Sequence, residues 1–332
     1  MTDENYTINE GTATCTWTLE GLAFMTPGTY IVNASVSDNA GALSCIDITV
    51  NVTREDARAT YTGSLFTSTS SVNSGIATVT LSATIQDITA VTRDIAHDPY
   101  TGDIRNAEVK FIDRETNSVL CIAPVGLVTH SDNKTGTATC DWVVDIGQAD
   151  SQDFTIGIVV NDYYTRDASA DNTIVTISKP LNEFITGGGY LIMTNSSGLY
   201  PADAGTKANF EFNVKYNKKG TNLKGRVNII IRNGDRVYQI KSNAIDQLSV
   251  DSPNATFNSK ANIQDITDPL IPISIDGNAA LQMTLTDNGE PGSSDSIAFT
   301  LWNKNGGLWY SSNWDGTKTI EQNLDGGNLV VK

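Results

Sequence analysis

The chain has 332 residues, and 38 Asp and Glu against 22 Lys and Arg give it a formal net charge of -16. This acidic balance excludes the basic surface that nucleic-acid binding requires and disfavours contact with anionic membranes. No apolar run reaches the roughly 18 residues that a membrane-spanning helix needs, and the N-terminus lacks the basic and apolar segments of a signal peptide.

Short runs of alternating apolar and polar residues recur along the whole chain, separated by clusters of Gly, Asn and Asp. Thr, Val and Ile in such runs favour strands, and the clusters between them favour turns. No run combines the apolar spacing of an amphipathic helix with helix caps. The sequence therefore predicts an all-β protein, with strands that include 29–36, 77–85, 155–160 and 226–232.

An internal repeat sets the predicted domain organisation. Residues 11–17 read GTATCTW and residues 136–142 read GTATCDW. The similarity continues downstream, where 30–36 aligns with 154–160 and 46–50 aligns with 173–177. Because the order and character of three successive strands recur, we interpret the two blocks as copies of one structural unit.

The two copies differ in completeness. The complete copy spans 60–180 and offers about seven strand-like runs, as expected of an immunoglobulin-like sandwich. The first copy, 1–55, has too few residues before its GTATC block to contain the front half of the unit. Two explanations are open: a fragment of a longer array, which we favour, or a reduced domain that leans on its neighbour.

The third region, 181–332, repeats nothing upstream. It opens with the glycine-rich segment 184–190, contains about eight strand-like runs, and ends with a strand-like segment at 327–332. Its size and pattern predict a jelly-roll-like C-terminal sandwich. The predicted architecture is thus a series of tandem β-sandwiches: an incomplete immunoglobulin-like unit, a complete one, and this third sandwich.

Several of these segments resemble a known class of protein. The block from GTATC at 136 to the junction at 178–180 resembles the Ig-like or PKD-like repeats of large bacterial extracellular proteins. Segments 184–190 (FITGGGY), 208–216 (ANFEFNVKY) and 325–331 (DGGNLVV) resemble the C-terminal sandwich that often follows anchor-type domains there. The resemblance implies a location outside the cell or on its surface, with other domains of a longer parent chain as neighbours. Modules of this kind serve as stalks, parts of adhesins or appendages of hydrolases, so it does not define one function.

The four cysteines form no C-x-x-C pair, and their wide spacing predicts two disulfides in an oxidising compartment. Strand-like runs flank the segment between Cys121 and Cys140, and a turn lies at 132–136, so we expect these two to pair. Cys15 would then pair with Cys45 by exclusion. The alternative is four buried free thiols. Trp142 follows the GTATC cysteine at the repeated position, which indicates a core residue.

The sequence contains two candidate calcium sites. The first combines the loops around 94–103 and 162–171, which emerge at the same end of the sandwich in an immunoglobulin-like topology, and calcium takes six to eight oxygen ligands. The second is the acidic loop 287–295, which lies in the third region and lacks the EF-hand pattern. The alternative for both is a set of solvated turn residues, with Arg105 and Arg166 as local partners. The candidate ligands are Asp94, Asp98, Asp103, Asp167, Asp171, Asp287, Glu290 and Asp295.

An aromatic cluster close to the C-terminus is a candidate sugar platform. Trp309, Tyr310 and Trp314 lie within six residues of one another, and exposed coplanar rings would stack on pyranose faces. The alternative is packing of the same rings across a hairpin.

Nothing in the sequence predicts catalysis. The chain has two histidines, His97 and His130, in different loops, and it carries no G-x-S-x-G, H-E-x-x-H or P-loop motif. We therefore predict a non-catalytic structural and adhesive region of a secreted surface protein. Calcium is its candidate stabilising ion, and a glycan or a protein is its candidate ligand. The alternative is a carbohydrate-binding accessory region of a secreted hydrolase. An enzyme with paired carboxylates is a third and weaker interpretation.

Overall fold

The computed structural model describes residues 5–9, 12–16, 27–37, 43–88, 102–180, 183–290 and 292–332. Within these residues the protein is all-β, with only short 3-10 helices between strands. The all-β prediction is therefore confirmed. The predicted strand at 29–36 falls in β3, that at 77–85 in β7, that at 155–160 in β12 and that at 226–232 in β17.

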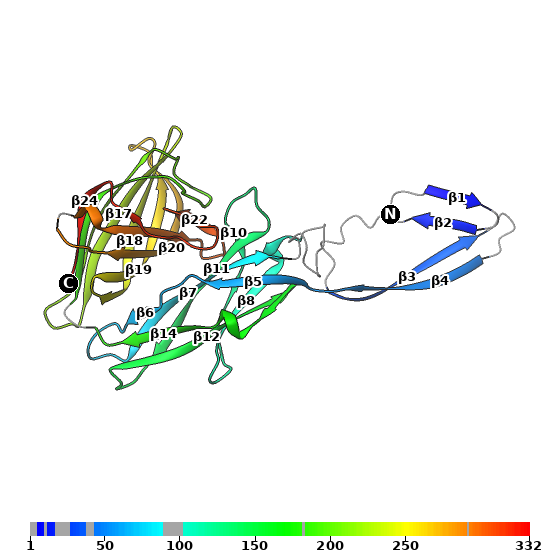
Figure 1. The fold of residues 1–332 in the computed structure, drawn as a ribbon, viewed down its shortest axis with the longest axis horizontal. Helices are drawn as coiled ribbons and strands as arrows, with labels where there is room; N and C mark the ends of the chain where they lie inside the picture. The colour runs from blue at the N-terminus through cyan, green and yellow to red at the C-terminus, as the bar shows by residue number, and fades with distance from the viewer. Residues whose placement is uncertain are drawn as a thin grey trace.

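The N-terminal segment forms two separate antiparallel pairs, which lie away from the larger sheets in Figure 1. The first consists of β1 (Asn5–Asn9) and β2 (Thr12–Thr16), and the second of β3 (Gly28–Ser37) and β4 (Leu43–Val52). Strands β12 and β14, to which β3 and β4 align in the repeat, also pair antiparallel, but in a register shifted by two residues: Tyr30 lies opposite Val50, whereas Phe154 lies opposite Val175. That the two blocks are copies of one structural unit stays a prediction.

The middle region, residues 55–180, packs two sheets around one core. The first sheet runs in the order β10-β11-β7-β5, the second in the order β9-β8-β12-β14-β6, and β13 pairs with both β12 and β5. Large side chains from both sheets, such as Leu81, Phe111 and Ile158, are fully buried between them. The strands of this region are β5 (Glu55–Tyr61), β6 (Phe66–Ser68), β7 (Ile76–Asp87), β8 (Ala107–Asp113), β9 (Val119–Pro124), β10 (Gly126–Leu127), β11 (Thr135–Asp145), β12 (Ser151–Asp162), β13 (Tyr164–Asp167) and β14 (Thr173–Ser178).

The predicted disulfide between Cys121 and Cys140 is present, with an S–S distance of 2.03 Å. It joins β9 to β11, so it links the second sheet to the first. The side chains of Cys15 and Cys45 lie outside the described part of the chain, and their pairing stays a prediction. Trp142 is buried and meets Phe154 edge to face at 5.1 Å, which confirms it as a core residue.

The C-terminal region, residues 183–332, is one strongly curled antiparallel sheet. Strands β15 to β22 pair in sequence order, β24 returns to pair with β15, and β23 pairs with β21. The curl closes around a core that draws on most of the strands, including Phe212, Phe257, Phe299 and Tyr310. The strands are β15 (Phe184–Ile192), β16 (Lys207–Tyr216), β17 (Leu223–Asn233), β18 (Arg236–Asp251), β19 (Asn254–Asp265), β20 (Ile273–Thr286), β21 (Ser296–Trp302), β22 (Leu308–Ser311), β23 (Gln322–Asn323) and β24 (Gly326–Val331).

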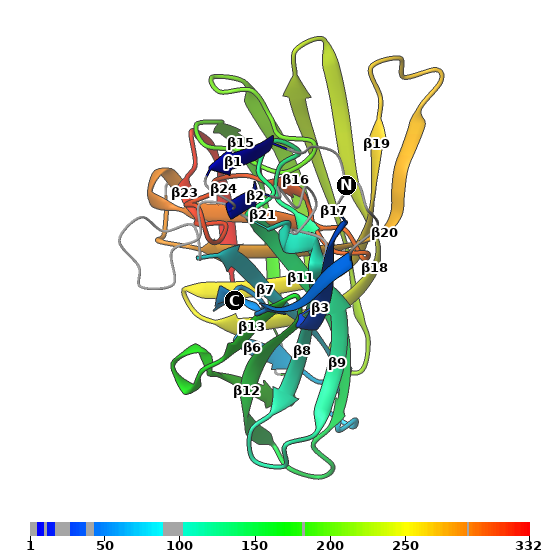
Figure 2. The same cartoon turned by 90° about the vertical axis from the view of Figure 1, so that its right-hand side faces the viewer.

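This half-barrel differs from the jelly-roll-like sandwich predicted for 181–332. A jelly roll divides its strands between two sheets, whereas here neighbouring strands along the chain pair with each other. Register shifts in β18–β19 and β19–β20 mark bulges, which bend and twist a sheet until its apolar face encloses its own core. The hairpins between β17 and β18 and between β19 and β20 both project at the same end of the sheet (Figure 2).

Strand β7 shows how the two regions meet. Most residues of β7 are buried, although only alternate side chains face the core of the middle region. Thr80, Ser82 and Thr84 lie on the other face, and Thr84 Oγ1 donates to the carbonyl of Thr317 at 2.5 Å. The polar face of β7 is thus covered by the C-terminal region.

Candidate functional site

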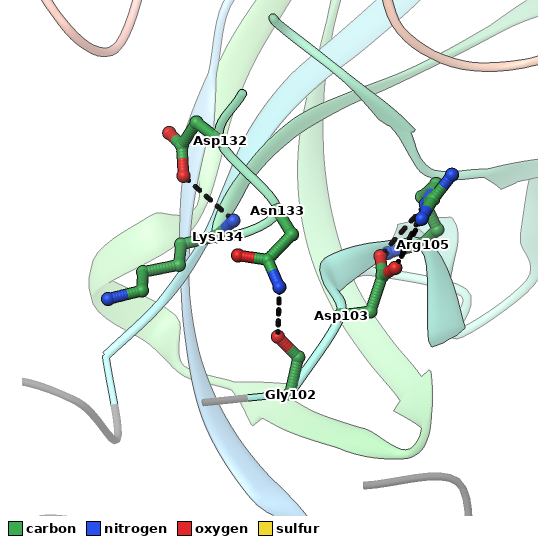
Figure 3. Close-up of polar contacts among 6 residues, drawn as sticks. All are labelled: Gly102, Asp103, Arg105, Asp132, Asn133 and Lys134. Atoms are coloured by element: carbon green, nitrogen blue, oxygen red, sulfur yellow. Dashed lines mark hydrogen bonds and ion pairs between the residues drawn. The ribbon is translucent and has the colours of Figure 1, made fainter. Parts of the chain in front are cut away.

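In the acidic loop at 94–103, the described carboxylate, Asp103, is paired with an arginine. Asp103 caps the short 3-10 helix Ile104–Asn106, and both of its carboxylate oxygens accept hydrogen bonds from the Arg105 side chain (Figure 3). This side-chain hydrogen bond is the main reason that the pKa of Asp103 lies below its ordinary value. Asn133 Nδ2 donates to the carbonyl of Gly102 and fixes the neighbouring loop.

Asp167 and Asp171, the two described candidate ligands of the neighbouring loop, also have arginine partners. Arg114 Nη2 donates to Asp167 at 2.7 Å, and Arg166 makes a bidentate pair with Asp171 at 2.5 and 2.9 Å. Asp94 and Asp98 lie outside the described residues. Among the residues that the structure describes, no group of three or more His, Cys, Asp or Glu is placed to hold a metal. Calcium binding by this loop cluster stays a prediction, and a bound cation would compete with these arginines.

A group that the sequence analysis missed lies beside this loop. Glu55 and Asp87 are both almost fully buried; Glu55 accepts a hydrogen bond from Gly102 N, and Asp87 accepts one from the Tyr164 hydroxyl. Burial, followed by the charges of these two carboxylates, raises the pKa of Tyr164 far above its ordinary value. No local motif marks these residues, because they come from β5, β7 and β13 and meet only through strand pairing.

The second acidic loop binds the protein's own backbone. Asp295 is fully buried, and its carboxylate accepts hydrogen bonds from Asn288 N and Leu329 N at 2.9 Å each. Asp287 accepts one from Val331 N at 2.9 Å, and Glu290 accepts one from the Asn328 side chain. The three predicted ligands thus hold the final strand, β24.

The three aromatic residues predicted as a platform lie in different surroundings. Tyr310 is fully buried in the core of the half-barrel and offers no face to a sugar. Trp309 is half-buried, donates from Nε1 to Asp276 at 2.8 Å, and packs against Tyr200. Trp314 lies where the two regions meet and packs against a buried cluster that includes Trp302. Strand alternation and the following turn separate residues that are close in sequence.

A buried polar network joins the two regions. Asn258 Nδ2 donates to Ser64 Oγ at 2.6 Å and to Gln247 Oε1 at 3.0 Å, while Thr67 Oγ1 donates to the same Gln247 oxygen. Further contacts cross the boundary at other points. Lys260 forms an ion pair with Asp141 at 2.5 Å, and the Tyr216 hydroxyl donates to the carbonyl of Thr69. Backbone hydrogen bonds join Val72 to Gly220 and Gly307 to Thr137. Directional bonds between buried groups favour one relative placement of the two regions, although Gln247 Nε2 is buried without a hydrogen-bond partner among the described residues.

Beside this network lies a cleft of about 570 Å³ between the two regions, which we call the junction cleft. The middle region contributes residues 61–66 and Thr173, and the C-terminal region contributes parts of β19, β20 and β21 together with the segment 318–321 and Trp314. Clefts at domain boundaries are preferred places for ligand sites. The sequence analysis did not predict this cleft, since neither region forms it alone.

No family model, no curated protein and no solved structure matches this chain. No helix in the described part of the chain is long and apolar enough to cross a membrane. His130 is exposed in a turn, and His97 lies outside the described residues.

Proposed function

We propose that this chain is a non-catalytic structural and adhesive region of a secreted surface protein. The supporting observation is the buried junction between the middle and C-terminal regions, where hydrogen bonds link Asn258, Gln247, Ser64 and Thr67 across the boundary. A spacer must hold its parts in a fixed relation, and a polar network out of water does this with directional bonds.

The middle region supports the immunoglobulin-like part of this proposal. Its two sheets follow the strand order of that fold, with β10-β11-β7-β5 facing β9-β8-β12-β14-β6. The disulfide between its sheets suits an oxidising compartment outside the cell. On this proposal the partners of the chain are other domains of a longer parent protein and a surface ligand.

The proposal can be tested by introducing a larger side chain at the junction. Gly126 in β10 touches the backbone of Gly306 and Gly307, so a side chain there would overlap the opposite region. Gly126→Val should split the thermal unfolding of the full chain into two transitions and increase its radius of gyration in solution scattering. Gly277→Val is the matched control, because a Cβ at Gly277 meets nothing within 4 Å.

Two results would count against the proposal. One is a wild-type scattering curve that requires several relative placements of the two regions. The other is a Gly126→Val protein that melts and scatters like the Gly277→Val control. Labelling of intact source cells with an antibody against the chain checks the surface location separately.

A further inference from the structure

The walls of the junction cleft carry a distinctive chemistry. In a chain of net charge -16, only Lys318 and Glu321 among the lining residues carry a charge. Most of the polar lining consists of hydroxyl and amide side chains, namely Thr62, Thr173, Asn254, Thr256, Thr284 and Thr319. Thr62, Asn254 and Thr319 also hydrogen-bond within the protein. The neutral donors and acceptors that remain match a ligand that is itself neutral and rich in hydroxyl groups.

The carboxylate of Glu321 already accepts hydrogen bonds from within the protein. Its Oε2 accepts hydrogen bonds from Thr286 Oγ1 at 2.9 Å and from Ser296 Oγ at 2.5 Å. This leaves Lys318, an exposed side chain on the rim, as the charged group without such internal bonds among the lining residues that the structure describes. A single rim cation is a weak attraction for a polyanion on so acidic a chain.

Four aromatic residues line the cleft: Tyr61 and Phe66 from the middle region, and Trp302 and Trp314 from the C-terminal region. Phe66 of β6 is 49% exposed, and Trp314 is partly buried against the apolar cluster that includes Trp302. The backbone of Trp314 is fixed on both sides, since its N–H donates to the carbonyl of Asn195 at 2.7 Å and its carbonyl accepts from the Asn195 side chain. A fixed backbone reduces the entropic cost of presenting the indole ring to an apolar ligand face.

The segment that carries Trp314 is also anchored to the middle region. Thr84 and Gln86 of β7 donate to the carbonyls of Thr317 and Gly316. Inside the cleft, Thr319 shares its hydroxyl with Thr300 and Ser311. The cleft is therefore built from fixed parts of both regions.

We propose that the junction cleft binds a short neutral oligosaccharide. Pyranose rings present apolar C–H faces for the aromatic side chains and hydroxyl groups for the threonine and asparagine wall, and the cleft volume lies within the range of roughly 300–1,000 Å³ common for ligand sites. The inference rests on the fixed arrangement of the two regions in the proposed function, because each region supplies one wall.

The experiment is a titration calorimetry panel on the full chain. The probes are cellotetraose, mannotetraose, maltotetraose and chitotetraose as neutral ligands, with tetragalacturonate as the anionic comparison. We expect at least one neutral tetrasaccharide to bind and tetragalacturonate not to bind. Trp314→Ala should weaken that binding at least tenfold, and Phe66→Ala, at an exposed position that is safe for folding, should weaken it several-fold.

Trp309→Phe is the matched control, because Trp309 packs on Tyr200 and is not part of the cleft lining. Its affinity should equal that of the wild type. No binding of any neutral probe, equal binding of tetragalacturonate, or a loss with Trp309→Phe but not with Trp314→Ala or Phe66→Ala would overturn the inference. The wild type could prove rigid, with a junction that opens in Gly126→Val, and yet bind no neutral probe. That result would overturn the cleft inference and leave the proposed function standing. A wild type whose two regions move independently would overturn the proposed function first.

Discussion

The side-chain carboxylate of Asp295 accepts a hydrogen bond from the backbone N–H of Leu329 at 2.9 Å. Two residues further along β24, Val331 N donates in the same way to Asp287. Thr186 and Gly188 of β15 lie opposite Val330 and Asn328, the alternate residues of β24. Among the described residues, β24 is the edge strand of its sheet and pairs only with β15. The side-chain carboxylates thus bind the N–H groups of β24 that point away from β15.

Asp295→Asn should therefore destabilise the C-terminal region by about 1–3 kcal/mol, because an amide nitrogen would replace an acceptor at a fully buried position. Urea unfolding measures the change, and hydrogen exchange at Leu329 should accelerate. Glu290→Gln is the control, since Glu290 is exposed and accepts from a side chain only. Equal stability of the two variants would contradict this role for Asp295.

Asn258 is the centre of the junction network. Asn258→Ala removes the donors to both Ser64 and Gln247 and leaves buried acceptors without them, at an expected cost of about 1–3 kcal/mol. Calorimetry should show a lower melting temperature and separate unfolding of the two regions. Asn243→Ala serves as control, because exposed Asn243 makes one bond to the carbonyl of Gly277. A single unchanged transition in Asn258→Ala would show that the network does not couple the regions.

Asp246 gives the junction a pH dependence. Burial, opposed by Lys260 and reinforced by Asp141, raises its pKa above the ordinary value of 3.8. The folded state therefore favours the protonated form, and stability present below pH 3.8 is lost as the pH rises through the raised pKa. Asp246→Asn should melt at a higher temperature than the wild type at pH 7 and at the same temperature at pH 3. A stabilisation that is equal at both pH values, or that also appears with exposed Asp235→Asn, would refute this cause.

The disulfide Cys121–Cys140 closes a loop between residues 19 apart in sequence. The loop-entropy account assigns about 3 kcal/mol to a cross-link of this span. Replacing both cysteines by alanine should lower the stability of the middle region by that order in urea unfolding without reductant. If reductant destabilises the wild type but not the double variant, the effect belongs to this bond. Unchanged wild-type stability under reduction would contradict the prediction.

Calcium binding by the acidic loops of the middle region can be tested by chelation. A cation bound only to the folded state at a hundredfold excess over its Kd adds about 2.7 kcal/mol, so EDTA should lower the melting temperature by several degrees. The combined variant Asp98→Ala and Asp167→Ala should lose this response. The Asp287→Ala variant should keep it, because Asp287 binds the backbone of β24. An unchanged melting curve of the wild type in EDTA would contradict calcium binding by these loops.

The sequence predicted what is local in this fold. Strands such as β3 and β7 were predicted from alternation, because a period of two places one face on a core whatever the partner. The pairing of Cys121 with Cys140 followed from strands on either side of a turn. The curl of the C-terminal sheet did not follow, because the same alternation suits a sandwich and a half-barrel, and only the pairing order distinguishes them.

The candidate site was less accessible to prediction. Tyr310 and Trp314 are four residues apart, yet one points into the half-barrel core and the other reaches the junction. The junction cleft depends on the docking of two regions whose facing residues are far apart in sequence, such as Thr67 and Gln247. No pattern within either region encodes that docking.

The projecting hairpin between β19 and β20 ends in an apolar tip, where Leu270 is 89% exposed and Ile271 is 70% exposed. Pro269 and Pro272 flank these two residues and carry no backbone N–H, and Asp268 accepts hydrogen bonds from the N–H groups of both Leu270 and Ile271. A tip without available donors cannot template an incoming β-strand. The protein can therefore expose aliphatic side chains to water here without offering a seed for amyloid-like aggregation.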